Sequence, residues 1–312
     1  MADPSKVAAI DIGTNSVLLV IAAAGPHGAE PLVQRATITR LGEGVDQTRR
    51  LAPAAVQRNL ACLRAYADDL RQHGSPRLDV VGTSALRDAQ GAGEFLDEAE
   101  RILGVRPRVI AGDEEARLTF GGALSGLSLS GKLLVFDVGG GSTELIVGDA
   151  ASKQTSARVS LDIGSVRLTE RHVKSDPPTR AELAAIEADI ARELDSAAPL
   201  SALVSGEPLT LVGVAGALTT LKAIELGLAP YDGARVHGAP LTLNVVEALC
   251  IKLAALPLAE RKLLPGLEPK RADVIVAGAL IVRDLMRRVG AAQTIVSDRG
   301  VRFGLLEALI SA

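Results

Sequence analysis

The sequence has little cysteine, few aromatic residues and no tryptophan. Of its 312 residues two are cysteines, and aromatic residues make up 2%. Cys62 and Cys250 lie far apart in apolar helical patterns, which argues against both a disulfide framework and a zinc site. Stacking surfaces for single-stranded nucleic acid need aromatic side chains that this chain does not supply. The core must therefore be built from aliphatic residues.

The sequence also lacks long apolar runs and an excess of basic charge. No stretch approaches the ~20 apolar residues that span a bilayer, and residues 1–6 (MADPSK) lack the apolar core of a secretory signal. The net charge is −3 and the isoelectric point about 5.9, whereas general nucleic-acid binding needs a clustered basic face. We expect a cytoplasmic protein with neither a membrane nor a nucleic acid as partner.

Length and composition predict two globular domains. The chain is 47% hydrophobic and 23% charged, and its length divides naturally at roughly 100–200 residues per domain. Residues 121–131 are rich in Gly and Ser, as in a hinge. We therefore expect one domain over 1–125 and a second over 126–298, with the C-terminal helix, 299–312, packing back on the first.

Hydrophobic periodicity predicts alternating strands and helices, which is typical of an α/β fold. The predicted strands are 7–13, 17–21, 34–41, 78–82, 107–110, 132–137, 143–147, 159–162, 209–212 and 294–297. The predicted helices are 53–73, 92–103, 113–121, 180–198, 217–226, 244–256, 271–289 and 301–309.

Two strand–turn–strand units carry a similar polar turn. The first has Asp11 at the end of a strand, and the second has Asp137 at the corresponding place. Glycine lets the backbone approach a ligand, and N–H groups and hydroxyls in such turns can hold phosphate. Either turn alone also fits a tight hairpin, but both together indicate an internal duplication and phosphate binding. The predicted phosphate-binding residues are Gly13, Thr14, Asn15 and Ser16 in the first turn and Gly139, Gly140, Gly141 and Ser142 in the second.

Two further features add to this prediction. Asp137 and Glu144 flank the second turn from its two strands, and paired hard oxygen ligands suit Mg²⁺, which keeps several waters. A strand running through Gly213 and Gly216 into a helix predicts a third phosphate-binding loop, although small residues there also serve close helix packing.

The order of motifs along the chain resembles the exopolyphosphatase and guanosine pentaphosphate phosphohydrolase (Ppx/GppA) family. The motifs lie at residues 9–16 (AIDIGTNS), 82–89 (GTSALRDA), 114–118 (EEARL), 137–145 (DVGGGSTEL), 161–168, 271–279 and 296–302. They cover nearly the whole chain. The resemblance implies the short form of the family, with two ribonuclease-H-like domains of the actin-like ATPase superfold facing a central cleft.

The resemblance also implies catalytic roles. Glu115 is similar to the general base that activates water, with Glu114 as the weaker alternative, although acids at a helix start also complement the helix dipole. Arg87 would grip the terminal phosphate. Asp137 and Glu144, with Asp11 through water, would hold Mg²⁺, or Mn²⁺ as an alternative.

The resulting functional hypothesis is an exopolyphosphatase acting on linear inorganic polyphosphate, with short chains favoured. Alternatives are a guanosine pentaphosphate phosphohydrolase, a kinase of the same superfold, and a sensor without turnover. An intact set of carboxylates argues against the sensor, and a homodimer is what the resemblance suggests.

Three features stay outside this assignment. His237 fits a structural hydrogen-bonding role as well as a functional one. The third loop has Ala215 where a glycine-rich turn is expected, and Phe303 stands where a polar residue is common. The basic residues that fit either a polyanion path or solvated helix faces are Arg261, Lys262, Lys270, Arg271, Arg283, Arg287 and Arg288.

Overall fold

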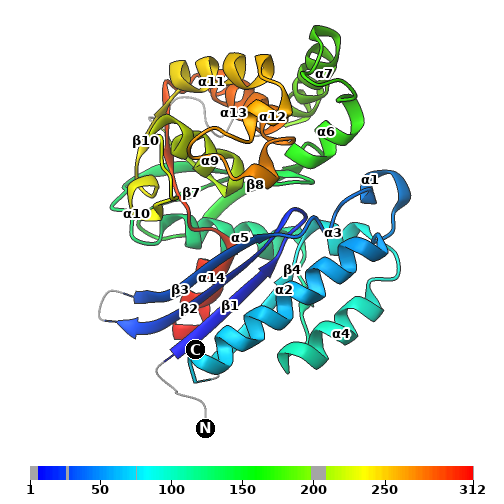
Figure 1. The fold of residues 1–312 in the computed structure, drawn as a ribbon. Coiled ribbons are helices and arrows are strands. Elements are labelled where there is room, and N and C mark those ends of the chain that lie inside the picture. The colour runs from blue at the N-terminus through cyan, green and yellow to red at the C-terminus, as the bar shows by residue number, and fades with distance from the viewer. Residues whose placement is uncertain (1–5, 26–27, 75, 198–208, 312) are drawn as a thin grey trace. The chain divides into compact units, whose positions relative to one another are not determined.

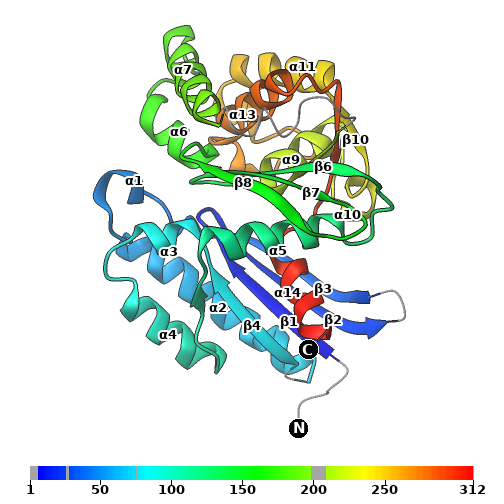
Figure 2. The same cartoon turned by 180° about the vertical axis from the view of Figure 1, so that it is seen from behind.

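A computed structural model describes residues 6–25, 28–74, 76–197 and 209–311. The chain forms two compact units, the first comprising Met1–Ser125 with Gly300–Ala312 and the second Gly126–Arg299. Figures 1 and 2 show the elements of both units from opposite sides. None of the helices in the described ranges is long and apolar enough to cross a membrane.

Unit 1 is built on a five-stranded sheet with the order β3-β2-β1-β4-β5. β1, β2 and β3 form an antiparallel meander, while β4 pairs parallel with β1 and β5 parallel with β4. The strands are β1 (Lys6–Ile12), β2 (Ser16–Gly25), β3 (Gly28–Ile38), β4 (Arg77–Gly82) and β5 (Arg108–Val109).

Helices cover both faces of this sheet, which is why the middle of β1, from Val7 to Ile10, is apolar and buried. Its alternate residues Ala8, Ile10 and Ile12 join one core with α2 and α4, and Val7 and Ala9 join another with α5 and α14. The helices are α1 (Val45–Thr48), α2 (Pro53–Gln72), α3 (Ser84–Asp88), α4 (Gly93–Leu103), α5 (Gly112–Leu124) and α14 (Val301–Ser311).

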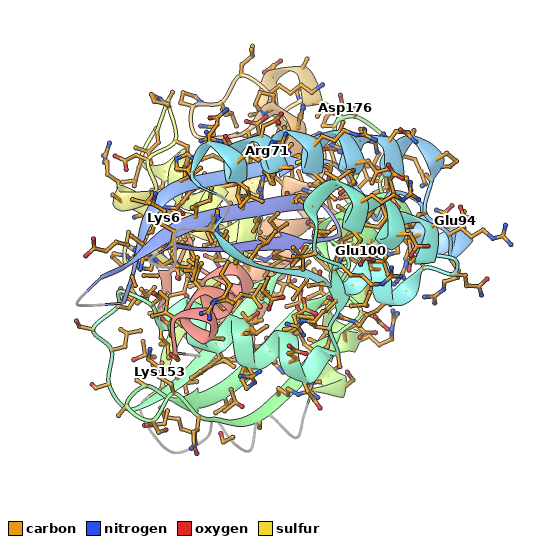
Figure 3. All side chains as sticks on the ribbon, turned by 90° about the horizontal axis from the view of Figure 1, so that it is seen from below. Lys6, Arg71, Glu94, Glu100, Lys153 and Asp176 are labelled. Carbon is orange, nitrogen blue, oxygen red and sulfur yellow. The ribbon has the colours of Figure 1, made fainter. Side chains whose placement is uncertain are left out.

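Outward-facing charge and inward-facing apolar residues separate cleanly in this unit. The exposed sides of α2 and α4 carry charged residues such as Arg71, Glu94 and Glu100 (Figure 3). On the inner side, Phe303 of α14 is completely buried. Phe303, which stands where a polar residue is common in the family, therefore fills the core of unit 1.

The packing of α14 on α5 depends on a close backbone approach. A Cβ atom on Gly304 would lie 2.1 Å from the carbonyl oxygen of Leu118, and one on Gly122 would lie 2.0 Å from that of Gly300. Neither position can accept a side chain without separating the helices. These glycines hold the C-terminal helix against the rest of unit 1.

Unit 2 has a six-stranded sheet with the order β10-β11-β9-β6-β7-β8. β6, β7 and β8 form an antiparallel meander, β9 and β11 run parallel to β6, and β10 closes the edge antiparallel to β11. The strands are β6 (Lys132–Val138), β7 (Thr143–Asp149), β8 (Thr155–Leu161), β9 (Thr210–Val214), β10 (Pro240–Thr242) and β11 (Gln293–Val296).

Helix α13 lies at the centre of the unit 2 core, with most of its residues buried. Its neighbours pack around it and against the sheet (Figures 1 and 2). The helical elements are α6 (Ser165–His172), α7 (Arg180–Ser196), α9 (Ala215–Glu225), α10 (Gly233–Val236), α11 (Leu243–Ala255), α12 (Leu258–Arg261), the 3-10 turn η1 (Pro269–Arg271) and α13 (Ile275–Arg288).

The two sheets share one topology. Reading β6, β7, β8, β9 and β11 of unit 2 as the counterparts of β1 to β5 gives the same order and the same strand directions. The predicted α/β fold class, with two ribonuclease-H-like units, is confirmed.

The predicted elements were wrong or incomplete in several places. The short elements α3, α6 and β10 were not predicted, and the helix predicted over 271–289 is interrupted, because η1 ends at Arg271 and α13 begins at Ile275. β3 begins earlier and ends earlier than predicted. Residue 198, the predicted end of a helix, and residues 1–5 lie outside the described ranges.

Candidate active site

The two predicted phosphate-binding turns have the same geometry. In unit 1 the amide of Gly13 donates a hydrogen bond to the carbonyl oxygen of Ser16 at 3.0 Å, and in unit 2 Gly139 donates to Ser142 at 3.0 Å. A Cβ atom on either glycine would lie 3.0–3.1 Å from that oxygen. Both turns therefore favour glycine at this position.

The turn of unit 1 is held by the segment that follows β3. Asn15 accepts hydrogen bonds at its carbonyl oxygen from the amides of Thr39 and Arg40, both at 3.0 Å. Thr14 accepts one from Gly42 at 2.9 Å. These bonds fix the turn backbone from one side.

Two polar oxygens beside this turn are buried and have no hydrogen-bond partner among the described residues: Oδ1 of Asp11 and Oδ1 of Asn15. Native structures rarely leave such atoms unsatisfied. The pKa of Asp11 is raised to about 7, mainly by burial and further by the negative charge of Glu115, while Arg302 opposes the shift. A ligand or water would satisfy these atoms.

The structure brings the two predicted catalytic residues together within unit 1. Glu115 lies in the first turn of α5 and is buried, and Arg87 lies in the last turn of α3. Arg87 Nη1 donates to Glu115 Oε2 and also to the carbonyl oxygen of Ile110, the latter at 3.1 Å. Burial raises the pKa of Glu115, Arg87 lowers it, and Asp88 adds to the rise. A buried carboxylate with a raised pKa is a candidate proton acceptor.

Glu114, the alternative base, has a different environment. Its carboxylate pairs with Arg108 at 2.8 Å, and Arg108 also pairs with Asp79 at 2.9 Å. Arg108 is half-exposed, so this is a surface ion-pair network. The environment of a general base is found at Glu115.

In unit 2, Asp137 and Glu144 lie directly opposite each other in the antiparallel pairing of β6 with β7. Directly opposed residues point to the same face of a sheet with Cβ atoms about 5 Å apart. Glu144 is buried and accepts a hydrogen bond from Ser160 Oγ at 2.9 Å. Two carboxylates are thus presented side by side.

This donor set fits magnesium. No group of three or more His, Cys, Asp or Glu that could hold a metal occurs within the residues the structure describes. Mg²⁺, however, is commonly bound by one or two carboxylates together with water and substrate phosphates. Asp137 and Glu144 are two such carboxylates, presented from neighbouring strands.

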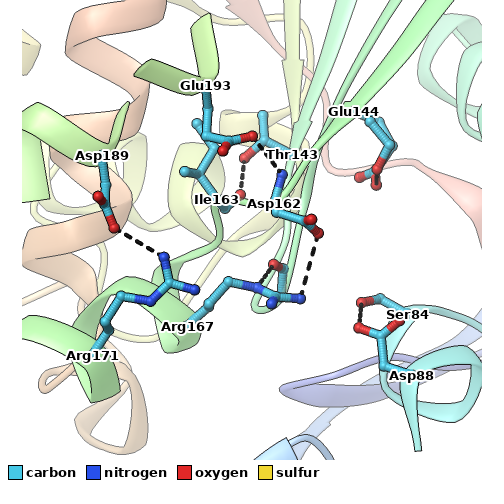
Figure 4. A network of polar contacts seen from close by, with 12 residues as sticks. Ser84, Asp88, Thr143, Glu144, Asp162, Ile163, Arg167, Arg171, Asp189 and Glu193 are labelled. Atoms are coloured by element: carbon cyan, nitrogen blue, oxygen red, sulfur yellow. Dashed lines mark hydrogen bonds and ion pairs between the residues drawn. The ribbon is translucent and has the colours of Figure 1, made fainter. Parts of the chain in front are cut away.

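The turn of unit 2 is supported by α6, which the sequence did not predict. Gly139 accepts at its carbonyl oxygen from the amide of Ser165 at 2.9 Å, and Gly140 accepts from Val166 and Arg167. Arg167 is buried, donates through Nε to the carbonyl oxygen of Gly141 at 2.6 Å, and lies 3.8 Å from Asp162 (Figure 4). The glycine turn and the start of α6 therefore hold each other.

Sequence reasoning gave no role to three of these residues: Arg167, which supports the unit 2 turn, Ser160, which donates to Glu144, and Arg302, which lies near Asp11. Arg167 falls within a motif that was recognised, residues 161–168, and that motif was the available signal. Arg302 likewise falls within a recognised motif, residues 296–302. Ser160 lies outside the motifs and acts through Glu144 on a neighbouring strand, so nothing local in the sequence marks it.

The glycines of the third loop have packing roles. A Cβ atom on Gly213 would lie 2.7 Å from the side chains of Phe136 and Leu218, and one on Gly216 would lie 1.4 Å from Arg271 Nη1. Between them Ala215 has a φ of 72°, a conformation that favours glycine. A phosphate-binding role for this loop stays a prediction.

His237 and the basic residues of unit 2 are engaged in other contacts. His237 Nδ1 lies 3.3 Å from both Ser297 Oγ and Asp298 Oδ1. Ion pairs join Arg261 to Asp176, Arg283 to Glu187, Arg287 to Glu247 and Arg288 to Asp195, at 2.5–3.0 Å. Each of these four arginines is paired with an acid of the same unit, and a role for them in a polyanion path stays a prediction.

Comparison with known proteins places these features in a family context. The family model described as "Ppx/GppA phosphatase family" matches residues 20–311. Exopolyphosphatase 2 of Mycobacterium tuberculosis is 38% identical over 315 residues, covering 96% of this chain and 97% of the relative.

Solved structures agree with the sequence comparison. The Ppx/GppA family member of Aquifex aeolicus is 34% identical, with a TM-score of 0.80 over 98% of this chain and 97% of the other. An exopolyphosphatase from Cytophaga hutchinsonii is 25% identical, with a TM-score of 0.88 over 98% of each chain. The resemblance inferred from the motifs is confirmed.

Proposed function

This chain belongs to the Ppx/GppA phosphatase family, and we propose that it is an exopolyphosphatase that removes the terminal phosphate of linear inorganic polyphosphate. Its similarity to an exopolyphosphatase over nearly the full length of both chains supports this substrate. The observation that carries the proposal is the ion pair between the buried Glu115 and the half-buried Arg87. Attack of water on a phosphoric anhydride needs a proton acceptor and a cation at the transferred phosphate, and this pair supplies both.

Glu115 is the proposed general base. In the free enzyme the Arg87 guanidinium opposes the burial that raises the pKa of Glu115. A phosphate that draws Arg87 into its own hydrogen bonds weakens that opposition, so the carboxylate then holds a proton more readily. Substrate binding thereby increases the basicity of Glu115 at the moment when it takes a proton from the attacking water.

Arg87 has the complementary role. Its guanidinium can form two parallel hydrogen bonds to phosphate oxygens and neutralise charge that develops on them. The bond from Nη1 to the carbonyl oxygen of Ile110 holds the side chain in place at 3.1 Å. The turn backbones and hydroxyls, among them those of Thr14 and Ser142, would position the phosphate.

Magnesium is the proposed cofactor, with Mn²⁺ as the alternative. Asp137 and Glu144 would hold it directly and Asp11 through water. When bound, the ion neutralises phosphate oxygens and so supplies electrostatic stabilisation. Ser160 keeps Glu144 oriented by its hydrogen bond at 2.9 Å.

The test is phosphate release from tripolyphosphate, long polyphosphate, guanosine pentaphosphate and ATP, each with Mg²⁺ and with a chelator. We expect chelator-sensitive release from the polyphosphates. Release from guanosine pentaphosphate alone would instead support the phosphohydrolase alternative. If no substrate gives metal-dependent release, the hydrolase proposal is wrong, and the kinase or the sensor gains support.

A further inference from the structure

The segment between Arg40 and Arg50 contacts two parts of the candidate site in unit 1, the glycine turn and the end of α3. At its start, the amides of Arg40 and Gly42 bind the carbonyl oxygens of Asn15 and Thr14, in the glycine turn. At its end, the carbonyl oxygen of Arg49 accepts a hydrogen bond from the amide of Gln90 at 2.8 Å, just after the helix that carries Arg87. The segment is thus anchored beside the glycine turn and beside α3.

Helix α1 forms the middle of this segment and lies beside α3 (Figures 1 and 2). It spans four residues, Val45–Thr48, which is about 6 Å at 1.5 Å per residue. Only the single helical turn of α1 therefore separates Arg49 from the residues that contact the glycine turn. The segment is short, and both of its ends are fixed.

The backbone of the segment is strained where it carries charge. Arg40 has a φ of 52° and Arg49 a φ of 56°. Residues other than glycine rarely adopt this conformation, and when they do, the surrounding structure must enforce it. Arg49 ends α1 with its own amide bonded to the carbonyl oxygen of Val45 at 2.9 Å, so its position is defined by the fold.

Arg49 and Arg50 are both exposed, and neither side chain makes an ion pair with any residue in the described ranges. Of the two acids in the segment, Glu43 is paired with Arg58 at 2.5 Å, and Asp46 lies in the first turn of α1. The arginines of α12 and α13 in unit 2 differ, since each is paired with an acid. Arg49 and Arg50 are two adjacent positive charges available to an external anion.

We infer that Arg49 and Arg50 form a subsite for the internal phosphates of a linear polyphosphate, next to the terminal phosphate held at Arg87. The inference rests on the proposed function. A chain that continues past the terminal phosphate carries a negative charge on every further phosphate, and exposed arginines pair with phosphate without needing a buried pocket. The subsite distinguishes long chains from short ones, because tripolyphosphate has little chain left once its end is bound.

The experiment compares KM and kcat on long polyphosphate and on tripolyphosphate for the full chain and for the double variant Arg49→Gln with Arg50→Gln. On long polyphosphate, KM should rise roughly tenfold, as expected for the loss of two exposed charge pairs. The kcat on both substrates and the KM for tripolyphosphate should be little changed. Because exposed pairs are screened by salt, the difference in KM should shrink as ionic strength rises.

Two further variants control the result. Arg49→Lys with Arg50→Lys keeps the charge and should restore most of the affinity for long polyphosphate. Arg77→Gln removes an exposed arginine at the start of β4, where it pairs with Val7 at the end of the sheet away from the turn, and should change nothing.

The inference and the proposed function fail in different ways. The subsite is refuted if KM for long polyphosphate is unchanged in the glutamine variant, if both polyphosphates lose affinity equally, or if only guanosine pentaphosphate is affected. The proposed function fails instead if the unmodified protein releases phosphate from neither polyphosphate.

Discussion

The glycine turns of unit 1 and unit 2 share one backbone design but differ in their surroundings. In both, the first glycine donates to a serine carbonyl oxygen at 3.0 Å. The turn of unit 2 is backed by the start of α6 and by the buried Arg167. The turn of unit 1 is backed by a loop, and one oxygen each of Asp11 and Asn15 has no hydrogen-bond partner among the residues that the structure describes. The two turns thus share the same backbone conformation, while the groups that surround them differ.

The second difference is in the carboxylates. Asp137 faces Glu144 across its hairpin, but Asp11 faces Leu18 at the corresponding position. Unit 2 therefore offers a pair of acids suited to a metal, and unit 1 offers Asp11 with Glu115, the proposed base, from a different element. Under the proposed function, unit 1 would supply the proton acceptor and unit 2 the metal ligands.

The largest expected effect comes from removing the base in unit 1. Glu115→Gln keeps the shape of the side chain but cannot accept a proton, so kcat for polyphosphate hydrolysis should fall by about 10²–10⁴. Glu114→Gln is the matched control and should stay close to the activity of the unmodified chain, because Glu114 is engaged with Arg108 at the surface. Equal losses in the two variants would contradict the assignment.

A large effect on stability is expected at Asp11. Its pKa is about 7 in the folded protein and 3.8 ordinarily, so between these pH values the folded state holds a proton that the unfolded state has released. Stability conferred by the protonated form is therefore lost as pH rises through this window, by at most ~1.4 kcal/mol per pH unit.

Asp11→Asn should remove that dependence. Denaturant unfolding at pH 5, 6, 7 and 8, without metal or substrate, should show the free energy of unfolding of the unmodified protein falling relative to that of the variant. A difference that stays constant across these pH values would show that Asp11 is already ionised at pH 5.

A smaller effect is expected from the support of the metal ligands in unit 2. Ser160→Ala removes the hydrogen bond to Glu144. Loss of a group that orients a metal ligand typically weakens metal affinity 10–100-fold, and for a hydrated magnesium we expect roughly tenfold. Half-maximal activity should then need more Mg²⁺, with kcat at saturating Mg²⁺ little changed. A fall in kcat that Mg²⁺ cannot restore would argue against this role.

The smallest effect on stability is expected where a strand leads into a helix, at the junction of β4 with α3 in unit 1 and of β9 with α9 in unit 2. In unit 1, β4 leads into α3 through Thr83 with a φ of −113°, and in unit 2 β9 leads into α9 through Val214 with a φ of −123°, but the next residue, Ala215, has a φ of 72°. Ala215→Gly should relieve the strain and stabilise the protein by about 1 kcal/mol, seen as a higher Tm. An unchanged or lower Tm would show that the surrounding structure removes that strain in another way.

The sequence predicted the features that local patterns determine. The two turns follow from an aspartate at a strand end and a glycine after it, and the long helices follow from their periodicity. Glu115 and Arg87 were assigned from family motifs, because 28 positions separate them and no spacing rule brings them together.

The features that could not be predicted from the sequence depend on contacts between distant segments or are too short to show a pattern. The four-residue helix α1 and the three-residue strand β10 are too short to show a period. The partner of Arg261 is Asp176, 85 positions away, so a basic run in sequence could not be distinguished from a set of ion pairs. Burial decides the different environments of Glu114 and Glu115, and it is a property of the folded unit.

The most direct test of the division between the units is a Mg²⁺ titration of polyphosphate hydrolysis for Glu115→Gln and Glu144→Gln. The account predicts that Glu115→Gln lowers kcat without shifting the Mg²⁺ concentration for half-maximal activity, while Glu144→Gln shifts that concentration upward. If Glu115→Gln shifts the Mg²⁺ requirement, or Glu144→Gln lowers kcat with the requirement unchanged, the assignment of base and metal ligands to separate units is wrong.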